Sequence, residues 1–304
     1  MLRVVWTAVV FAFVCCGAAR AADEVCNLQR VAVLDSKVEG DIHLMLPATF
    51  GTRQTRLLLD TGGAWSMMRS PLADQLGLAP KKLRTTYYSD VAGGLIKHYV
   101  TVPKFTLGGQ LTLGESDFLY SPDKDADDID TYGGTLGAER LSAYDIEIDN
   151  TTKTVTLYRS DQFCSGRLVR WTDAWIEIPY TFNDENFETK VTIGDDRIKA
   201  IFDTGSTRTL MDLDVAKRVF GVGPDSPGVE KAYEATLPSG KKLQFYTYRV
   251  KALTISGLTF EDVTVRLGEF DHMPLVIGMH EIAQLHLYIA SKRKIIYATR
   301  REAK

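Results

Sequence analysis

The 304-residue chain lacks the features that mark several classes of protein. It has no basic excess, because 36 Lys and Arg residues stand against 39 Asp and Glu residues, so we expect no nucleic-acid partner. Its 5 His residues show no zinc-site spacing, and we expect no metal and no other cofactor. With 45% hydrophobic and 25% charged residues, the composition excludes a disordered chain, a collagen and a coiled coil.

Only one long apolar run is present, at the N-terminus. Residues 4–16 are apolar apart from Thr7, follow the basic Arg3, and precede Ala19-Arg20-Ala21, which has the A-x-A form of a signal-peptidase site. The run is shorter than the about 20 residues that a spanning helix needs. We predict a signal peptide over residues 1–21, export to the periplasm or the medium, and no stable membrane span after cleavage. An uncleaved anchor is the alternative.

Cysteine is scarce, with four residues in the whole chain. Cleavage after Ala21 leaves Cys26 and Cys164, and an even number of cysteines in an exported chain permits a disulfide. We expect this bridge as one possibility, and two free thiols as the other.

The chain repeats itself with an offset of 143 residues. Residues 57–62 read Leu-Leu-Leu-Asp-Thr-Gly, and residues 200–205 read Ala-Ile-Phe-Asp-Thr-Gly. Gly51 and Gly194 each stand nine residues before the Asp and begin a polar turn between two strand-like runs. Each copy therefore predicts a β-hairpin that leads into the Asp.

Further elements follow each Asp-Thr-Gly sequence in the same order. A helical stretch comes first (70–77 and 212–221), and then two apolar runs separated by a glycine-containing turn (87–99 and 233–248), which predict a hairpin. Alternating strands complete each copy. We predict an N-terminal lobe over residues 22–165 and a C-terminal lobe over residues 166–304.

Two copies of Asp-Thr-Gly are unlikely to arise by chance. At average composition a chain of this length holds about 0.05 copies. A duplicated unit with a two-fold axis beside the turns brings Asp60 and Asp203 together. Two adjacent carboxyl groups share one proton, so one can accept a proton from water while the other donates to a carbonyl oxygen.

These features resemble the retropepsin-like aspartic proteases, in particular their exported bacterial members. The resemblance rests on the two Asp-Thr-Gly turns, the helices, the hairpins and the late apolar-Gly pairs Leu136-Gly137 and Ile277-Gly278. It implies an all-β fold with a few short helices, in which two tandem β-barrel-like repeats form a bilobal, acid-protease-like molecule. It also implies an aspartic endopeptidase acting on a peptide or protein substrate.

The resemblance assigns roles to individual residues. Asp60 and Asp203 are the implied catalytic pair. The expected supporting residues of the two turns are Thr61, Gly62, Thr204, Gly205 and Ser206. The expected hairpin flap, which contacts the substrate, includes Tyr87, Tyr88, Gly93 and Gly94.

The sequence also departs from the family pattern. Gly63 stands where Ala or Ser is usual, while Ser206 fits the pattern in the second copy. Glu139 and His280 stand where Asp is common, and we interpret them as fold variation. We expect Trp65 to fill core space.

An acidic stretch over residues 123–130 begins like a calcium loop but lacks the required Gly and Glu, so we expect a solvated loop. Both Asp-Thr-Gly turns lie in one chain, so we expect a monomer. A catalytically silent peptide-binding protein of the same fold in the cell envelope is the main alternative, and a structural envelope protein is a more distant one.

Overall fold

The structure is a computed structural model of the chain. It describes five segments, residues 25–84, 88–122, 128–159, 164–183 and 186–301. The predicted signal peptide and Tyr87 lie outside these residues, as do Asp123, Asp125 and Asp127 of the acidic stretch.

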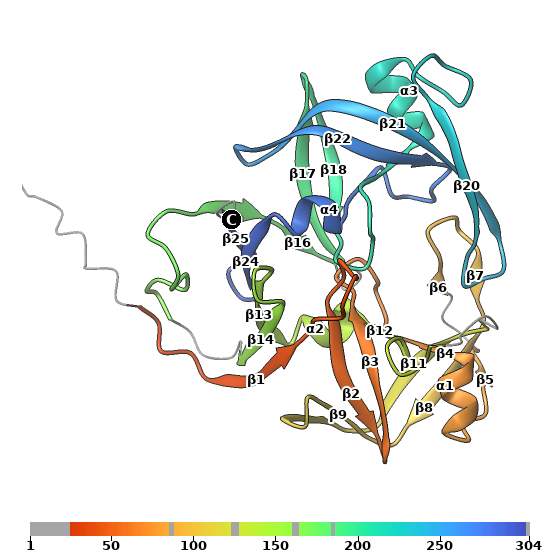
Figure 1. The fold of residues 1–304 in the computed structure, drawn as a ribbon, viewed down its shortest axis with the longest axis vertical. Helices are drawn as coiled ribbons and strands as arrows, with labels where there is room; N and C mark the ends of the chain where they lie inside the picture. Colours follow the sequence, from red (N-terminus) through yellow and green to blue (C-terminus); the bar gives the residue numbers. More distant parts are fainter. Residues whose placement is uncertain (1–24, 85–87, 123–127, 160–163, 184–185, 302–304) are drawn as a thin grey trace, which may run out of the picture.

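The molecule is built of β-sheets with a few short helices, arranged in two lobes on either side of a shared sheet (Figure 1). The predicted all-β, bilobal fold class is confirmed. The described helices are α1 (Ser70–Gln75), α2 (Ala138–Leu141), α3 (Leu213–Phe220) and α4 (Met279–Ile282). None of these helices has the length and apolar character that crossing a membrane requires.

The first lobe contains a nine-stranded sheet. Its strands, in spatial order, are β10 (Leu111–Leu113), β9 (Phe105–Leu107), β2 (Met45–Phe50), β3 (Arg53–Leu59), β12 (Gly134–Leu136), β4 (Met67–Arg69), β11 (Ser116–Ser121), β8 (His98–Val102) and β5 (Lys81–Lys82). The turn between β2 and β3 holds Gly51 at φ 62°, a left-handed conformation that glycine adopts without strain. The predicted hairpin into Asp60 is present.

The second lobe contains an eight-stranded sheet of matching design. Its strands, in spatial order, are β16 (Thr181–Phe182), β17 (Phe187–Ile193), β18 (Asp196–Phe202), β23 (Leu275–Ile277), β19 (Leu210–Asp212), β22 (Leu258–Gly268), β21 (Lys242–Ile255) and β20 (Glu230–Thr236). In each lobe, the strand that leads into the Asp pairs in parallel with the strand that ends at the late apolar-Gly pair, β3 with β12 and β18 with β23.

A six-stranded sheet joins the lobes, with three strands from each. Its order is β1 (Arg30–Asp35), β14 (Thr154–Arg159), β13 (Tyr144–Asp149), β24 (Leu285–Ala290), β25 (Ile295–Arg300) and β15 (Ile176–Pro179). The two central strands, β13 and β24, are antiparallel, with Ile146 opposite Ile289, and both side chains are buried. The lobes are therefore continuous through main-chain hydrogen bonds. The domain boundary at residues 165/166 stays a prediction.

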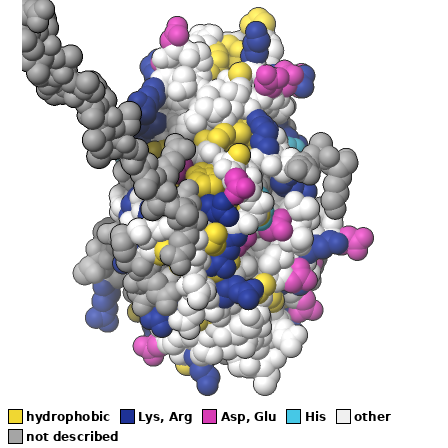
Figure 2. Space-filling model, turned by 90° about the vertical axis from the view of Figure 1, so that its left-hand side faces the viewer, with side chains coloured by type: hydrophobic (Ala, Val, Ile, Leu, Met, Phe, Trp, Pro, Cys, Tyr) yellow, Lys and Arg dark blue, Asp and Glu magenta, His cyan; other side chains and the backbone are white. Residues whose placement is uncertain are grey.

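A disulfide links Cys26 to Cys164 at the side of the shared sheet. Residues 164–175, which begin with Cys164, pack against this sheet, and we call them the interlobe segment. The Trp171 ring in this segment stacks on His286 of β24, with 3.7 Å between ring centroids. The disulfide thus fastens the residues that precede β1 to the interlobe segment. On this side of the molecule, basic and acidic side chains are intermingled (Figure 2).

Candidate active site

Asp60 and Asp203 occupy equivalent places at the junction of the lobes. Each comes directly after a buried strand, β3 or β18, so the strand fixes where its carboxyl group lies. The main-chain N–H of Asp60 donates to Leu136 O at 3.0 Å, and that of Asp203 donates to Ile277 O at 3.0 Å. Both late apolar-Gly strands therefore support the Asp turns beside them.

The threonines that follow each Asp join the two turns. The N–H of Thr61 donates to Thr204 Oγ1 at 3.2 Å, and the N–H of Thr204 donates to Thr61 Oγ1 at 3.0 Å. The Thr61 hydroxyl donates to Phe202 O at 2.6 Å, and the Thr204 hydroxyl donates to Leu59 O at 2.5 Å. Both threonines are fully buried, so this reciprocal network is shielded from water.

Main-chain N–H groups hold the two carboxyl groups in place. Gly63 donates to Asp60 Oδ1 at 2.7 Å. Asp203 Oδ1 accepts from Gly205 at 2.7 Å and from Gly62 at 3.2 Å. The two carboxyl groups also hydrogen-bond to each other. The hydrogen bond from Gly62 to Asp203 crosses the junction, because Gly62 belongs to the first lobe and Asp203 to the second.

The third position of each Asp-Thr-Gly turn must be glycine, because the carboxyl group of the opposite Asp lies too close to leave room for a side chain. A Cβ atom on Gly62 would lie 2.2 Å from Asp203 Cγ, and one on Gly205 would lie 2.5 Å from Asp60 Oδ1. Real contacts of this kind do not occur at such distances. Each glycine thus makes room for the carboxyl group of the opposite lobe.

The environment of the pair changes its acidity. Burial and the neighbouring Asp203 carboxyl group raise the pKa of Asp60 to about 8, although Gly63 and Gly62 N–H groups act in the other direction. Burial also raises the pKa of Asp203, while its hydrogen bonds to Gly205 and Asp60 lower it. Such an arrangement can hold one proton between two carboxyl groups near neutral pH.

The residue after each Asp-Thr-Gly differs between the lobes. Ser206 Oγ donates to Arg208 O at 2.7 Å and so braces its own loop. Gly63 has no side chain to do this, and a Cβ atom there would lie 2.5 Å from Asp60 Oδ2. In the first lobe, the Gly63 N–H therefore approaches the Asp60 carboxyl group closely, but the loop lacks the side-chain hydrogen bond that Ser206 makes in the second lobe.

The hairpins of the two lobes meet over the site, on the right of Figure 1. The first consists of β6 (Tyr88–Ser89) and β7 (Leu95–Ile96), and the second of β20 and β21. The N–H of Ser239 donates to Asp90 Oδ2 at 3.1 Å, and Lys241 Nζ donates to Ala92 O at 2.6 Å. Sequence reasoning missed these contacts, because nothing in either repeat indicates that the hairpins touch.

Of the predicted flap residues, Tyr88, Gly93 and Gly94 lie in the first hairpin, and Tyr87 is outside the described residues. Gly93 is in its turn at φ 74°, and a Cβ atom on Gly94 would lie 2.0 Å from Ser239 Oγ in the opposite hairpin. Tyr88 contacts Trp65, with 5.1 Å between ring centroids. The expectation that Trp65 fills core space is wrong in this respect, because Trp65 is only half-buried and supports the hairpin.

A profile of the family described as aspartyl protease matches residues 46–139 and again residues 189–280. The two matches each include one Asp-Thr-Gly turn and one late apolar-Gly pair. The chain belongs to this family. The retropepsin-like resemblance of the sequence is confirmed, and with it an aspartic-protease type of function. No curated protein matches the chain.

Two further carboxyl groups of this aspartyl protease family member are buried beneath the Asp turns. Glu139 Oε2 accepts from the N–H of Ser66 at 3.0 Å, and Glu281 Oε2 accepts from the hydroxyl of Thr209. Burial raises the pKa of both glutamates. Glu139 was noted in the sequence only as a departure from the pattern, and no sequence signal pointed to Glu281.

The described residues contain no group of three or more His, Cys, Asp or Glu side chains placed to hold a metal ion. Asp130, at the end of the acidic stretch, pairs with Arg53.

Proposed function

We propose that the chain is an aspartic endopeptidase that hydrolyses peptide bonds with a water molecule activated between Asp60 and Asp203. The observation that carries the proposal is the contact of these two enclosed carboxyl groups, whose pKa values are both raised. Their mutual hydrogen bond raises the pKa of Asp60 and lowers that of Asp203, after the larger effect of burial. In the proposed reaction, we assign the shared proton to Asp60 and the negative charge to Asp203.

In the proposed reaction, the Asp203 carboxylate accepts a proton from water as the water oxygen bonds to the carbonyl carbon of the substrate. Asp60 donates its proton to the carbonyl oxygen, and a neutral tetrahedral diol results. A proton then passes to the amide nitrogen, the carbon–nitrogen bond breaks, and one hydroxyl proton returns to the pair. The products are a carboxylic acid and an amine, and the pair again holds one proton.

The supporting residues keep the pair ready for this reaction. The Thr61 and Thr204 network fixes both turns, and the Gly62, Gly63 and Gly205 N–H groups orient the carboxyl oxygens. Catalytic groups gain most when their geometry is set before the substrate binds. The first hairpin, including Tyr88, is proposed to cover the bound peptide.

Digestion of a mixed peptide library at several pH values tests the proposal. We expect internal cleavage by the purified mature chain, read by mass spectrometry of the new termini. Intact peptides that nonetheless bind would contradict it and favour a catalytically silent binding protein.

We also propose that the chain is exported and acts as a monomer. A disulfide is stable in an oxidising compartment, which suits the proposed export, and one chain carries both Asp-Thr-Gly turns. If the dyad formed between two chains instead, specific activity would fall steeply on dilution through the nanomolar range.

A further inference from the structure

The two halves of the site correspond residue for residue, which allows their side chains to be compared. The N–H of Glu139 donates to Ala64 O at 3.2 Å, and the N–H of His280 donates to Thr207 O at 3.1 Å. Ala64 and Thr207 each stand four residues after the Asp of their own turn. The same contact thus recurs in both lobes, with Glu139 equivalent to His280.

Side chains at the next equivalent positions differ in charge. In the first lobe, Trp65 packs against Tyr88 of the hairpin, and Glu139 is largely buried beside it. In the second lobe, Arg208 stands where Trp65 does, and its Nη1 lies 3.2 Å from His280 Nδ1. One end of the site is therefore aromatic, and the other carries a guanidinium group beside an imidazole ring.

Within the segments that the structure describes, Arg208 forms no salt bridge with a carboxylate, although its charge acts against the burial that raises the pKa of the nearby Glu281. Glu281, which lies on the same helix as His280, hydrogen-bonds to Thr209 instead. Burial and the charge of Arg208 lower the pKa of His280. Because a guanidinium only donates, Nδ1 of His280 is the acceptor in this contact. A guanidinium has five N–H donors, and the paired geometry of the remaining ones suits a carboxylate.

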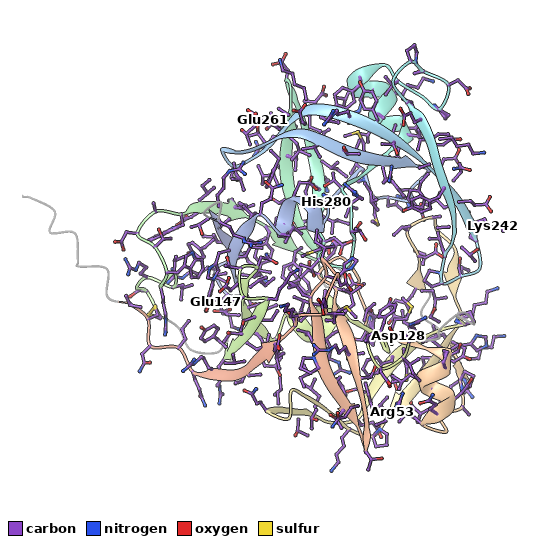
Figure 3. The ribbon with its side chains drawn as sticks, in the orientation of Figure 1. Arg53, Asp128, Glu147, Lys242, Glu261 and His280 are labelled. Carbon is purple, nitrogen blue, oxygen red and sulfur yellow. A yellow bond between two sulfur atoms is a disulfide. The ribbon has the colours of Figure 1, made fainter. Side chains whose placement is uncertain are left out.

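The segment that carries Arg208 faces the junction between the lobes. Thr207, the preceding residue, is exposed, and its Oγ1 lies 3.1 Å from Nε2 of His43 in the first lobe. Arg208 itself is partly exposed, and His280 lies on α4 close to this junction (Figure 3). Since the equivalent Trp65 lies beneath the first hairpin, Arg208 lies on the corresponding side of the second Asp turn.

We infer that Arg208 is a specificity-determining residue that binds an acidic side chain of the substrate on one side of the scissile bond. Trp65 and Tyr88 receive an apolar or aromatic side chain on the other side, because the pseudo-two-fold axis passes between the two positions. This inference rests on the proposed function and adds the class of substrate, a peptide that is aromatic on one side and acidic on the other.

Matched peptides test the inference. Each peptide carries an aromatic residue on one side of the scissile bond and a single Glu, or its uncharged isostere Gln, on the other side. The position of this Glu or Gln is varied from one pair of peptides to the next. At one position, we expect the wild-type kcat/KM to be about tenfold higher or more for Glu than for Gln, because a site built for a polar group discriminates strongly against its absence. Arg208→Gln should reduce this ratio to less than about twofold, because kcat/KM falls more for the Glu peptide than for the Gln peptide.

Arg218→Gln is the matched control. Arg218 lies on α3 and pairs with Asp196, away from the Asp turns, so this variant should keep the wild-type ratio. Equal losses on both peptides in Arg208→Gln, or an unchanged ratio, would overturn the inference.

Binding of the same peptides to Asp60→Asn, measured by fluorescence anisotropy, separates the inference from the proposed function. A Glu preference in binding that Arg208→Gln abolishes, with no cleavage by the wild type, would refute the endopeptidase and keep the inference. If the peptides are cleaved, but neither binding nor cleavage shows a preference for Glu, the inference about Arg208 is refuted and the proposed endopeptidase function is not.

Discussion

Thr61 and Thr204, 143 residues apart, each accept the main-chain N–H of the other on their hydroxyl oxygen. Each hydroxyl also donates to the strand that precedes the opposite Asp. The four bonds form a closed, buried set at the junction, so the position of one Asp depends on the turn of the other lobe.

Replacement of this network should be costly. In Thr204→Val the shape is kept, but the N–H of Thr61 and the carbonyl of Leu59 are left buried without their partner. We expect a loss of about 2–4 kcal/mol in the free energy of unfolding, measured by urea denaturation. Thr204→Ser retains the hydroxyl and is the control. A valine variant as stable as the serine variant would show that the network contributes little.

Asp60 and Asp203 should be equally indispensable to turnover. Asn at either position keeps the shape but removes a titrating group, and we expect kcat to fall by a factor of about 10² or more. The double variant should lose little beyond either single variant, because the two groups act as one unit. Steady-state kinetics on a cleaved peptide measures this.

Asp214→Asn is the control for the dyad variants. Asp214 lies in the first turn of α3, and its variant should stay active. A folded Asp60→Asn or Asp203→Asn enzyme with more than about a tenth of the wild-type turnover would contradict the mechanism.

Stability should depend on pH through the same pair. Asp60 has a pKa of about 8 in the folded chain, and about 4 is usual for an unfolded Asp. Between these values the folded chain holds a proton that the unfolded chain has lost, so the free energy of unfolding falls as pH rises, by at most about 1.4 kcal/mol per pH unit for one proton. The raised pKa values of Asp203, Glu139 and Glu281 act in the same direction.

Urea denaturation across this range, in wild type and Asp60→Asn, measures the effect. The variant should show a flatter pH dependence, because it cannot release that proton. Parallel curves for the two proteins would argue against a raised pKa at Asp60.

Loss of the Cys26–Cys164 disulfide should destabilise the chain. The bridge closes a long loop, with 138 residues of separation, and restricts the unfolded state. We expect the Cys26→Ser/Cys164→Ser double variant to lose about 2–5 kcal/mol in urea denaturation. Alkylation of the mature wild-type chain without reductant should find no free thiol at either position; two alkylated thiols would remove the basis of this prediction.

Much of this architecture was predictable, because the two repeats of the sequence can be compared with each other, and a feature present in both is unlikely to arise by chance. Gly51 and Gly194 indicated the hairpins, and the two Asp-Thr-Gly turns indicated where the lobes come together. The pairing of β13 with β24 was not predictable, since an alternating strand specifies which face is buried but not which strand lies beside it.

The side-chain environment of the site was harder to predict. Trp65 has the size and polarity of a core residue, and only the position of the hairpin shows that it supports Tyr88. The contact of Ser239 with Asp90 depends on two turns that are 149 residues apart and on the angle between the lobes, which no local pattern records. The sequence indicated Gly62 and Gly205 only as supporting residues of the turns, and their close contacts with the opposite Asp are visible in the structure alone.

The contact between the hairpins has a topological consequence. With the shared sheet on one side and the joined hairpins on the other, the chain forms a ring around the Asp turns (Figure 1). The first hairpin can therefore move away from the Asp turns only after its hydrogen bonds with Ser239 and Lys241 of the second hairpin have broken. A substrate that needs the first hairpin to move would then bind in two steps, of which the first is the breaking of these contacts.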